Sequence, residues 1–384
     1  MSGLTCRRAL ILVTCLTGIN GCGGNDKAPS MAAGGGGTTM AGAGPAAGEA
    51  GTTGGAGGSS GTGTAGGSGK GGSSGAGTAG FGGNAGSSSD ACQVLKDGEI
   101  GAHGLTSVYK TKNQGTATFP VGIEGDQLYF TADSKLMAYP LAGGAAKELG
   151  PLYGEHELVH DGKIYGVTGL SQEPMRKLFS ASITDVATLT TLAEGIENPY
   201  LLVADDTGLY FDRRQSSSIF KVPLAGGAPV ELVPGGRPSG MVSANGFLYW
   251  IDSDTKHLER VPAAGGAREQ VLPAPYGGPM VAVGTTLYWI NRGPNTVDRW
   301  DEGAEKSQTL TKSMNLLATP NQLAVQGDTV FWAGGIVCGE LHQVKTDGSG
   351  AALHARGTYG AEWVGVTDDA VFVLGNGALY RADR

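Results

Sequence analysis

Several features are scarce in this 384-residue chain, and each absence narrows the class of protein. No apolar run reaches the ~18–20 residues that a membrane-spanning helix needs, which excludes a polytopic membrane protein. Proline totals only 17 and the glycines follow no Gly-X-Y period, which excludes collagen. After residue 90, basic residues number 23 against 32 acidic ones, so nucleic acid is not an expected partner.

Glycine, in contrast, is abundant, with 69 residues, or about 18% against a usual ~7%. Residues 23–90 hold 27 of these glycines with only five charged residues and one aromatic. Such a segment cannot bury enough apolar surface to offset its chain entropy, so we expect a disordered linker. The part that follows, roughly 290 residues, is long enough to bury a sizeable core.

The N-terminus has the pattern of a secretory signal. Arg7 and Arg8 precede an apolar run of about 11 residues, which is too short for a stable membrane span. The sequence Ile19-Asn-Gly-Cys22 resembles the lipobox of bacterial lipoproteins, in which the cysteine is lipidated and becomes the mature N-terminus. The resemblance implies a lipid anchor on Cys22, and Gly23 after it favours the outer membrane. The alternative is an ordinary cleaved signal with a chance cysteine.

The chain therefore divides into three parts. We expect residues 1–21 to be the lipoprotein signal peptide, residues 22–90 the lipidated cysteine with its linker, and residues 91–384 the folded propeller domain. Within the domain only Cys92 and Cys338 remain, and two cysteines in an exported domain predict a disulfide. Two unpaired buried thiols are the alternative.

A short pattern, an aliphatic residue followed by one or two aromatics, recurs through the domain. Its central aromatics lie 36, 45, 39, 39, 43 and 41 residues apart, and this period is typical of four-stranded propeller blades. A short apolar strand precedes each aromatic strand, and a third strand, a tight turn such as Gly265-Gly266 and an outer strand follow it. The seven copies are centred on Tyr129, Tyr165, Tyr210, Tyr249, Tyr288, Phe331 and Phe372.

At Leu248-Tyr-Trp-Ile-Asp252, followed by Leu258-Glu-Arg260, the pattern resembles the YWTD repeat of the low-density-lipoprotein receptor. Val330-Phe-Trp332 begins a second partial match, and Asn291 replaces the repeat's aspartate in the unit between them. The resemblance covers most of residues 105–384 at the level of repeat pattern. It implies a six-bladed ring, whereas the seven motifs favour seven blades.

Strand counting also favours seven blades. The last unit, residues 363–384, supplies only three strands, and residues 105–110 read as a spare strand before the first unit. Adding that strand to the last blade would close the ring, remove an open sheet edge and bring Cys92 near Cys338. We therefore predict an all-β single propeller of seven four-stranded blades, closed by an N-terminal strand, with six blades as the alternative. Residues 185–193 read equally as a short helix or a strand.

The sequence predicts no catalytic residue, no cofactor and no metal site. His156 and His160 flank Glu157 on an expected innermost strand, where side chains four apart share a face. They could form half of a metal site beside a channel, but we favour two partly exposed polar residues.

Propeller ligands usually contact one mouth of the ring, near the starts of the inner strands. The candidates there mix aromatic, amide and charged side chains, which suits a sugar or a peptide. For Trp363 among them, packing between blades is the alternative. The candidate ligand-face residues are Tyr200, Arg237, Asn321, Glu362 and Trp363.

These observations predict a lipid-anchored propeller of the cell envelope, facing the periplasm or the exterior. We expect a non-enzymatic binding or scaffolding module with a protein or carbohydrate ligand at the propeller face. An exported propeller lyase or hydrolase with its site at the mouth of the ring is the alternative, and a purely structural envelope protein is a third possibility.

Overall fold

The computed structural model describes residues 104–112, 118–152, 154–168, 175–213, 216–311, 320–334, 339–358, 361–375 and 377–384. These residues form strands joined by turns, and among them no helix is long and apolar enough to span a bilayer. The predicted signal peptide, the lipidated Cys22, the linker and the Cys92–Cys338 disulfide lie outside the described residues.

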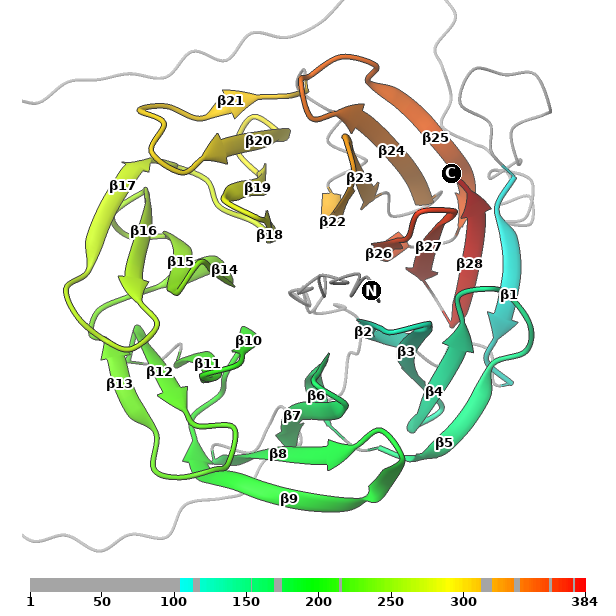
Figure 1. Ribbon diagram of the computed structural model, residues 1–384, viewed down its shortest axis with the longest axis horizontal. Helices are drawn as coiled ribbons and strands as arrows, with labels where there is room; N and C mark the ends of the chain where they lie inside the picture. Colours follow the sequence, from blue (N-terminus) through cyan, green and yellow to red (C-terminus); the bar gives the residue numbers. More distant parts are fainter. Residues whose placement is uncertain are drawn as a thin grey trace, which may run out of the picture. The chain divides into compact units, whose positions relative to one another are not determined.

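Seven four-stranded antiparallel sheets surround a common centre, each with its first strand innermost (Figure 1). The prediction of an all-β propeller with seven blades is confirmed, and the six-bladed alternative is wrong. Blade one consists of β2 (Thr118–Glu124), β3 (Gln127–Ala132), β4 (Lys135–Pro140) and β5 (Lys147–Pro151). Blade two consists of β6 (Glu155–His160), β7 (Lys163–Thr168), β8 (Arg176–Ser182) and β9 (Asp185–Ile196). Blade three consists of β10 (Leu202–Asp205), β11 (Gly208–Arg213), β12 (Ser218–Val222) and β13 (Val230–Val233).

The remaining blades repeat the same order. Blade four consists of β14 (Pro238–Ala244), β15 (Phe247–Asp252), β16 (His257–Pro262) and β17 (Glu269–Pro273). Blade five consists of β18 (Met280–Val283), β19 (Thr286–Asn291), β20 (Thr296–Asp301) and β21 (Gln308–Thr309). Blade six consists of β22 (Pro320–Gln326), β23 (Thr329–Gly334), β24 (Gly339–Lys345) and β25 (Ala352–Thr358). Blade seven has β26 (Ala361–Val366), β27 (Ala370–Gly375), β28 (Ala378–Asp383) and, as its outer strand, β1 (Thr106–Lys110).

The predicted ring closure is confirmed. Thr106 pairs with Arg381 and Lys110 with Ala378 in an antiparallel ladder, so the first strand of the domain completes the last blade. In Figure 1 the cyan β1 lies outside the red β28. Because both ends of the described chain share one sheet, blade seven has four strands like the other six blades.

Residues 185–193, which the sequence left open, belong to a strand. The twelve-residue β9 pairs with β8 and carries three threonines, whose β-branched side chains favour an extended backbone.

The aromatic strands are buried on both faces because each blade packs between two others. In β15, Leu248, Tyr249, Trp250 and Ile251 are all at most 1% exposed. Leu248 and Trp250 share a cluster with residues of blades three and five, so the cores of adjacent blades are continuous. Each aromatic strand is therefore a continuous apolar run, whereas a strand with one face in water would alternate apolar and polar residues.

We call the face of the ring where inner strands begin and second strands end the top face. In blades three to five these are the starts of β10, β14 and β18 and the ends of β11, β15 and β19. The hairpins between first and second strands lie on the opposite, bottom face, because antiparallel strands reverse direction there. The top face is the mouth at which the sequence predicts a ligand.

Candidate functional site

A hollow of about 240 Å³ lies on the top face where blades three, four and five meet. Its lining comes from the start of β10, the end of β11, the turn that leads into β14 and the residue after β19. Polar and charged side chains dominate this lining, and the most important are Tyr200, Asp212, Arg213, Arg237, Ser239 and Arg292.

Asp212 fixes the wall of the hollow that belongs to blade three. One oxygen of its carboxylate, Oδ1, accepts hydrogen bonds from the backbone N–H groups of Tyr200 and Leu201, both at 2.7 Å. Asp212 is only 3% exposed, so these bonds are shielded from competing water. They join the end of β11 to the start of β10 and thereby set the position of Tyr200.

Asp252 does the same for blade four. Its Oδ2 accepts from the backbone N–H of Arg237 at 3.0 Å, and its Oδ1 accepts from the N–H groups of Asp254 and Thr255, both at 2.9 Å. Burial alone would raise the pKa of this fully buried carboxyl, but the backbone hydrogen bonds, led by that of Thr255, hold the pKa below its usual value. Asp252 therefore stays ionised and anchors the turn that carries Arg237.

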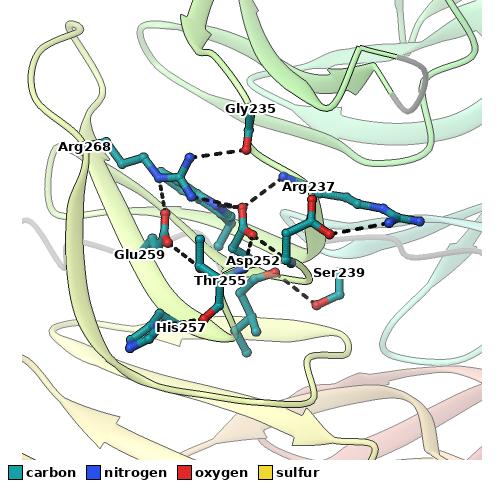
Figure 2. Close-up of polar contacts among 11 residues, drawn as sticks. Gly235, Arg237, Ser239, Asp252, Thr255, His257, Glu259 and Arg268 are labelled. Carbon is teal, nitrogen blue, oxygen red and sulfur yellow. Dashed lines mark hydrogen bonds and ion pairs between the residues drawn. The ribbon is translucent and has the colours of Figure 1, made fainter.

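An arginine completes the network around Asp252. Figure 2 shows the Arg268 guanidinium between two carboxylates, with Nε donating to Glu259 and Nη2 donating to Asp252 at 3.2 Å. Glu259 is fully buried and also accepts from the Thr255 hydroxyl at 2.6 Å. Each buried charge thus has an opposite charge and hydrogen-bond donors around it, as buried ions require.

The three arginines of the hollow have different surroundings. Arg237 contacts Asp254 at 3.5 Å, and both side chains are more than half exposed. Arg213 places its guanidinium carbon 4.1 Å from the centre of the Phe220 ring, a cation–π contact. Arg292 lies against Gly278, where a Cβ would sit 3.3 Å from its Nε. The three side chains give the hollow a positive lining in a chain whose net charge is −8.

The structure brings two of the five predicted ligand-face residues together, because Tyr200 and Arg237 both line the hollow. Glu362 is exposed in β26 of blade seven, where desolvation by nearby protein raises the pKa of its carboxyl. Asn321 lies in β22, with its side chain outside the described part of the structure.

Trp363 requires a correction. Its side chain is 0% exposed and belongs to the cluster that joins blades one and seven, beside Phe130 and Phe372. The indole fills inter-blade core, which was the alternative interpretation, and in this position it cannot touch a ligand on the surface. Burial of so large an apolar ring between blades is strongly favourable and explains its position.

Sequence reasoning missed Asp212, Arg213 and Arg292. A signal was available for the arginines, since each comes at or directly after the end of a second strand, in blades three and five. Asp212 follows its repeat tyrosine by two residues, whereas Asp252 follows Tyr249 by three. An alignment on the tyrosine therefore hides the fact that both aspartates hold the start of an inner strand.

The two histidines considered as metal ligands do lie on an innermost strand, β6, but at its opposite ends. His156 is on the top face, with its ring centroid 6.0 Å from that of Tyr200, whereas His160 lies 3.3 Å from Asp206 in a bottom-face hairpin. His156 has a φ of +56°, and the β6–β7 pairing shifts register beside it. Within the described ranges, no group of three or more His, Cys, Asp or Glu side chains could hold a metal ion.

No family model and no curated protein matches this chain. Among solved structures it is similar to the computationally designed Ika8 protein, with a TM-score of 0.52 and 10% identity over 73% of this chain and 100% of that chain. A nidogen/laminin complex gives a TM-score of 0.45 and 16% identity over 59% of this chain and 92% of the other. YCF48 bound to a D1 peptide gives a TM-score of 0.49 and 14% identity over 72% of this chain and 98% of the other. At these identities the similarity concerns the fold alone.

Proposed function

We propose that this protein is a lipid-anchored, YWTD-like propeller of the bacterial cell envelope that binds or scaffolds a ligand without catalysing a reaction. The observation that carries the proposal is the hollow on the top face. It joins Tyr200 and Arg237, two residues that the sequence marks as ligand-face candidates, with two further arginines. Aromatic and arginine side chains at a concave site are typical of binding surfaces.

The alternative, a propeller lyase or hydrolase, needs acid–base groups that converge in one pocket. The residues that line the hollow include neither His156 nor Glu362, the two such groups that the sequence offers at this mouth. Asp212, which does line it, accepts two backbone hydrogen bonds and is 3% exposed, so it positions the chain. These features favour binding over chemistry.

Photocrosslinking in the native cells tests which face binds. Ser253 lines the hollow, and we expect Ser253→p-benzoylphenylalanine to give one discrete crosslinked product in the envelope fraction. The matched control is Asp206, whose side chain is 96% exposed on the bottom face and which should give none when substituted in the same way. Crosslinks from residue 206 but not from residue 253 would place the ligand elsewhere and overturn the proposal.

The lipid anchor is separately testable. Replacing Cys22 by alanine removes the thiol that would carry the lipid, so we expect the protein to move from the membrane fraction to the soluble fraction. Cys15→Ala, within the signal peptide, is the matched control and should leave fractionation unchanged. Membrane association that persists in Cys22→Ala would refute lipidation of this cysteine.

A further inference from the structure

Two arginines of the hollow have no acidic partner among the described residues, which sets them apart from most of the other described arginines. The Arg213 and Arg292 side chains make no hydrogen bond or ion pair with any described residue, and the Nε–H of each is buried. Most other described arginines have a carboxylate within 4 Å, and the pairs are Arg176–Glu155, Arg260–Glu269, Arg268–Glu259, Arg299–Asp301 and Arg381–Asp383.

A shortage of acids does not explain these unpaired groups, because acidic residues outnumber basic ones in this domain. Leaving a buried donor without an acceptor is unfavourable, and placing like charges in one hollow adds repulsion. The only carboxylate of the lining, Asp212, already accepts two backbone N–H groups. A negatively charged ligand in the hollow would offset the repulsion between the arginines.

Arg237 can turn toward the same ligand. Its only ion pair among the described residues, with Asp254 at 3.5 Å, is exposed on both sides, and such pairs contribute little and exchange readily. Three arginines then line one hollow, and a guanidinium is a planar fork of donors that matches a carboxylate.

The size of the hollow indicates a single side chain or a chain terminus. Its volume of about 240 Å³ is below the ~300–1,000 Å³ of pockets that enclose a free small molecule. Beside it, the Tyr276 ring lies on Gly293, where a Cβ would come within 2.1 Å of it, and Tyr276 is 55% exposed. An exposed tyrosine next to arginines is the composition of a protein–protein hot spot, which favours a protein over a sugar.

We propose that this hollow binds a carboxylate of an acidic protein segment, an Asp or Glu side chain or a chain terminus, gripped by Arg213, Arg237 and Arg292. The inference rests on the proposed function, since it names the class of ligand for the same site. Tyr276, on the Gly293 backbone next to Arg292, would be an apolar contact for the rest of that segment.

The test follows the Arg Nε–H signals of the ¹⁵N-arginine-labelled full chain by NMR. We expect N-acetylglutamate N-methylamide to shift the signals of Arg213 and Arg292, with a dissociation constant on the order of 1 mM. The glutamine analogue, equal in shape but neutral, should not shift them. Arg237→Gln should weaken binding of the glutamate probe about five- to tenfold, because one charge-assisted hydrogen bond is lost.

Arg384→Gln is the matched control, since it removes the same charge from a bottom-face arginine whose side chain donates to the Gln326 carbonyl, and it should leave binding unchanged. Equal shifts with the glutamate and glutamine probes, or shifts with glucuronate or inorganic phosphate but not with glutamate, would overturn the inference. If the residue-253 crosslink persists in that case, the ligand class is wrong and the binding face stands. If the crosslink is also absent, the proposed function fails as well.

Discussion

Asp252→Ala should lower the free energy of unfolding of the propeller by about 3–5 kcal/mol, the usual effect of removing one partner of a buried ion pair. The carboxylate is 0% exposed and accepts from three backbone N–H groups, the Trp250 indole and Arg268. Without it, those donors lose their acceptor, and Arg268 keeps Glu259 as its one remaining carboxylate partner among the described residues. Unfolding in urea, followed by tryptophan fluorescence, measures the change.

Asp254→Ala is the matched control because it removes the same group two residues later. The Asp254 side chain is 56% exposed and its one ion pair within the described ranges is with Arg237, so we expect a change within about 0.5 kcal/mol. Equal losses of stability in the two variants would show that the network in Figure 2 contributes no more than a surface charge.

The Asp252 substitution should also disturb the binding site. Its Oδ2 holds the backbone of Arg237, at the point where the chain enters β14. Loss of that bond frees the turn that forms one wall of the hollow. The aspartate of blade four therefore has a structural role with a direct consequence for binding. In Asp252→Ala, the free energy of unfolding and the affinity for the glutamate probe should fall together.

The architecture could be predicted from the sequence because each blade is built from local signals. The positions of Tyr129 to Phe372 gave a period near 40, and every one of these aromatics lies in the second strand of a blade. Closure by residues 106–110 was also predictable, since the last unit has one strand too few and an unpaired edge is costly.

The site was predictable only in part. Tyr200 and Arg237 follow from their places before inner strands, a feature of one blade at a time. The contribution of Arg213 and Arg292 depends on how blades three and five converge beside blade four, which no local pattern encodes. The sequence placed Trp363 on the ligand face although it lies in the core. Its position near the start of an inner strand does not reveal which way the side chain points.

Glu157 should make the propeller less stable as the pH rises from about 4.5 to about 7. Its side chain is 2% exposed, and desolvation raises the pKa of the carboxyl to about 7. The carboxyl lies against the Phe179 ring in space left by two glycines, since a Cβ on Gly154 would be 2.8 Å from Glu157 Oε1 and one on Gly166 would be 3.0 Å from its Cγ. Arg176, at the start of β8, pairs with Glu155.

The sign follows from proton binding. Between these pH values the folded chain keeps the Glu157 proton and the unfolded chain has lost it, so raising the pH favours unfolding. The protonated carboxyl stabilises the fold fully at pH values below its pKa in the unfolded chain, and this stabilisation is lost as the pH rises to its pKa in the folded chain. At ~1.4 kcal/mol per pH unit, the total loss is about 3 kcal/mol. Asp252 has the opposite dependence, at lower pH, because its folded-state pKa is lowered.

Glu157→Gln isolates this contribution, because the amide has the shape of the protonated acid and does not ionise. Urea unfolding at intervals from pH 4.5 to 8 should show a slope for the wild type that the variant lacks, with the variant more stable by up to about 3 kcal/mol at pH 8. Glu194→Gln, at an exposed position paired with Lys177, is the control and should keep the wild-type slope. If Glu157→Gln keeps that slope as well, another group is responsible, and the assignment of Glu157 as a buried neutral acid is wrong.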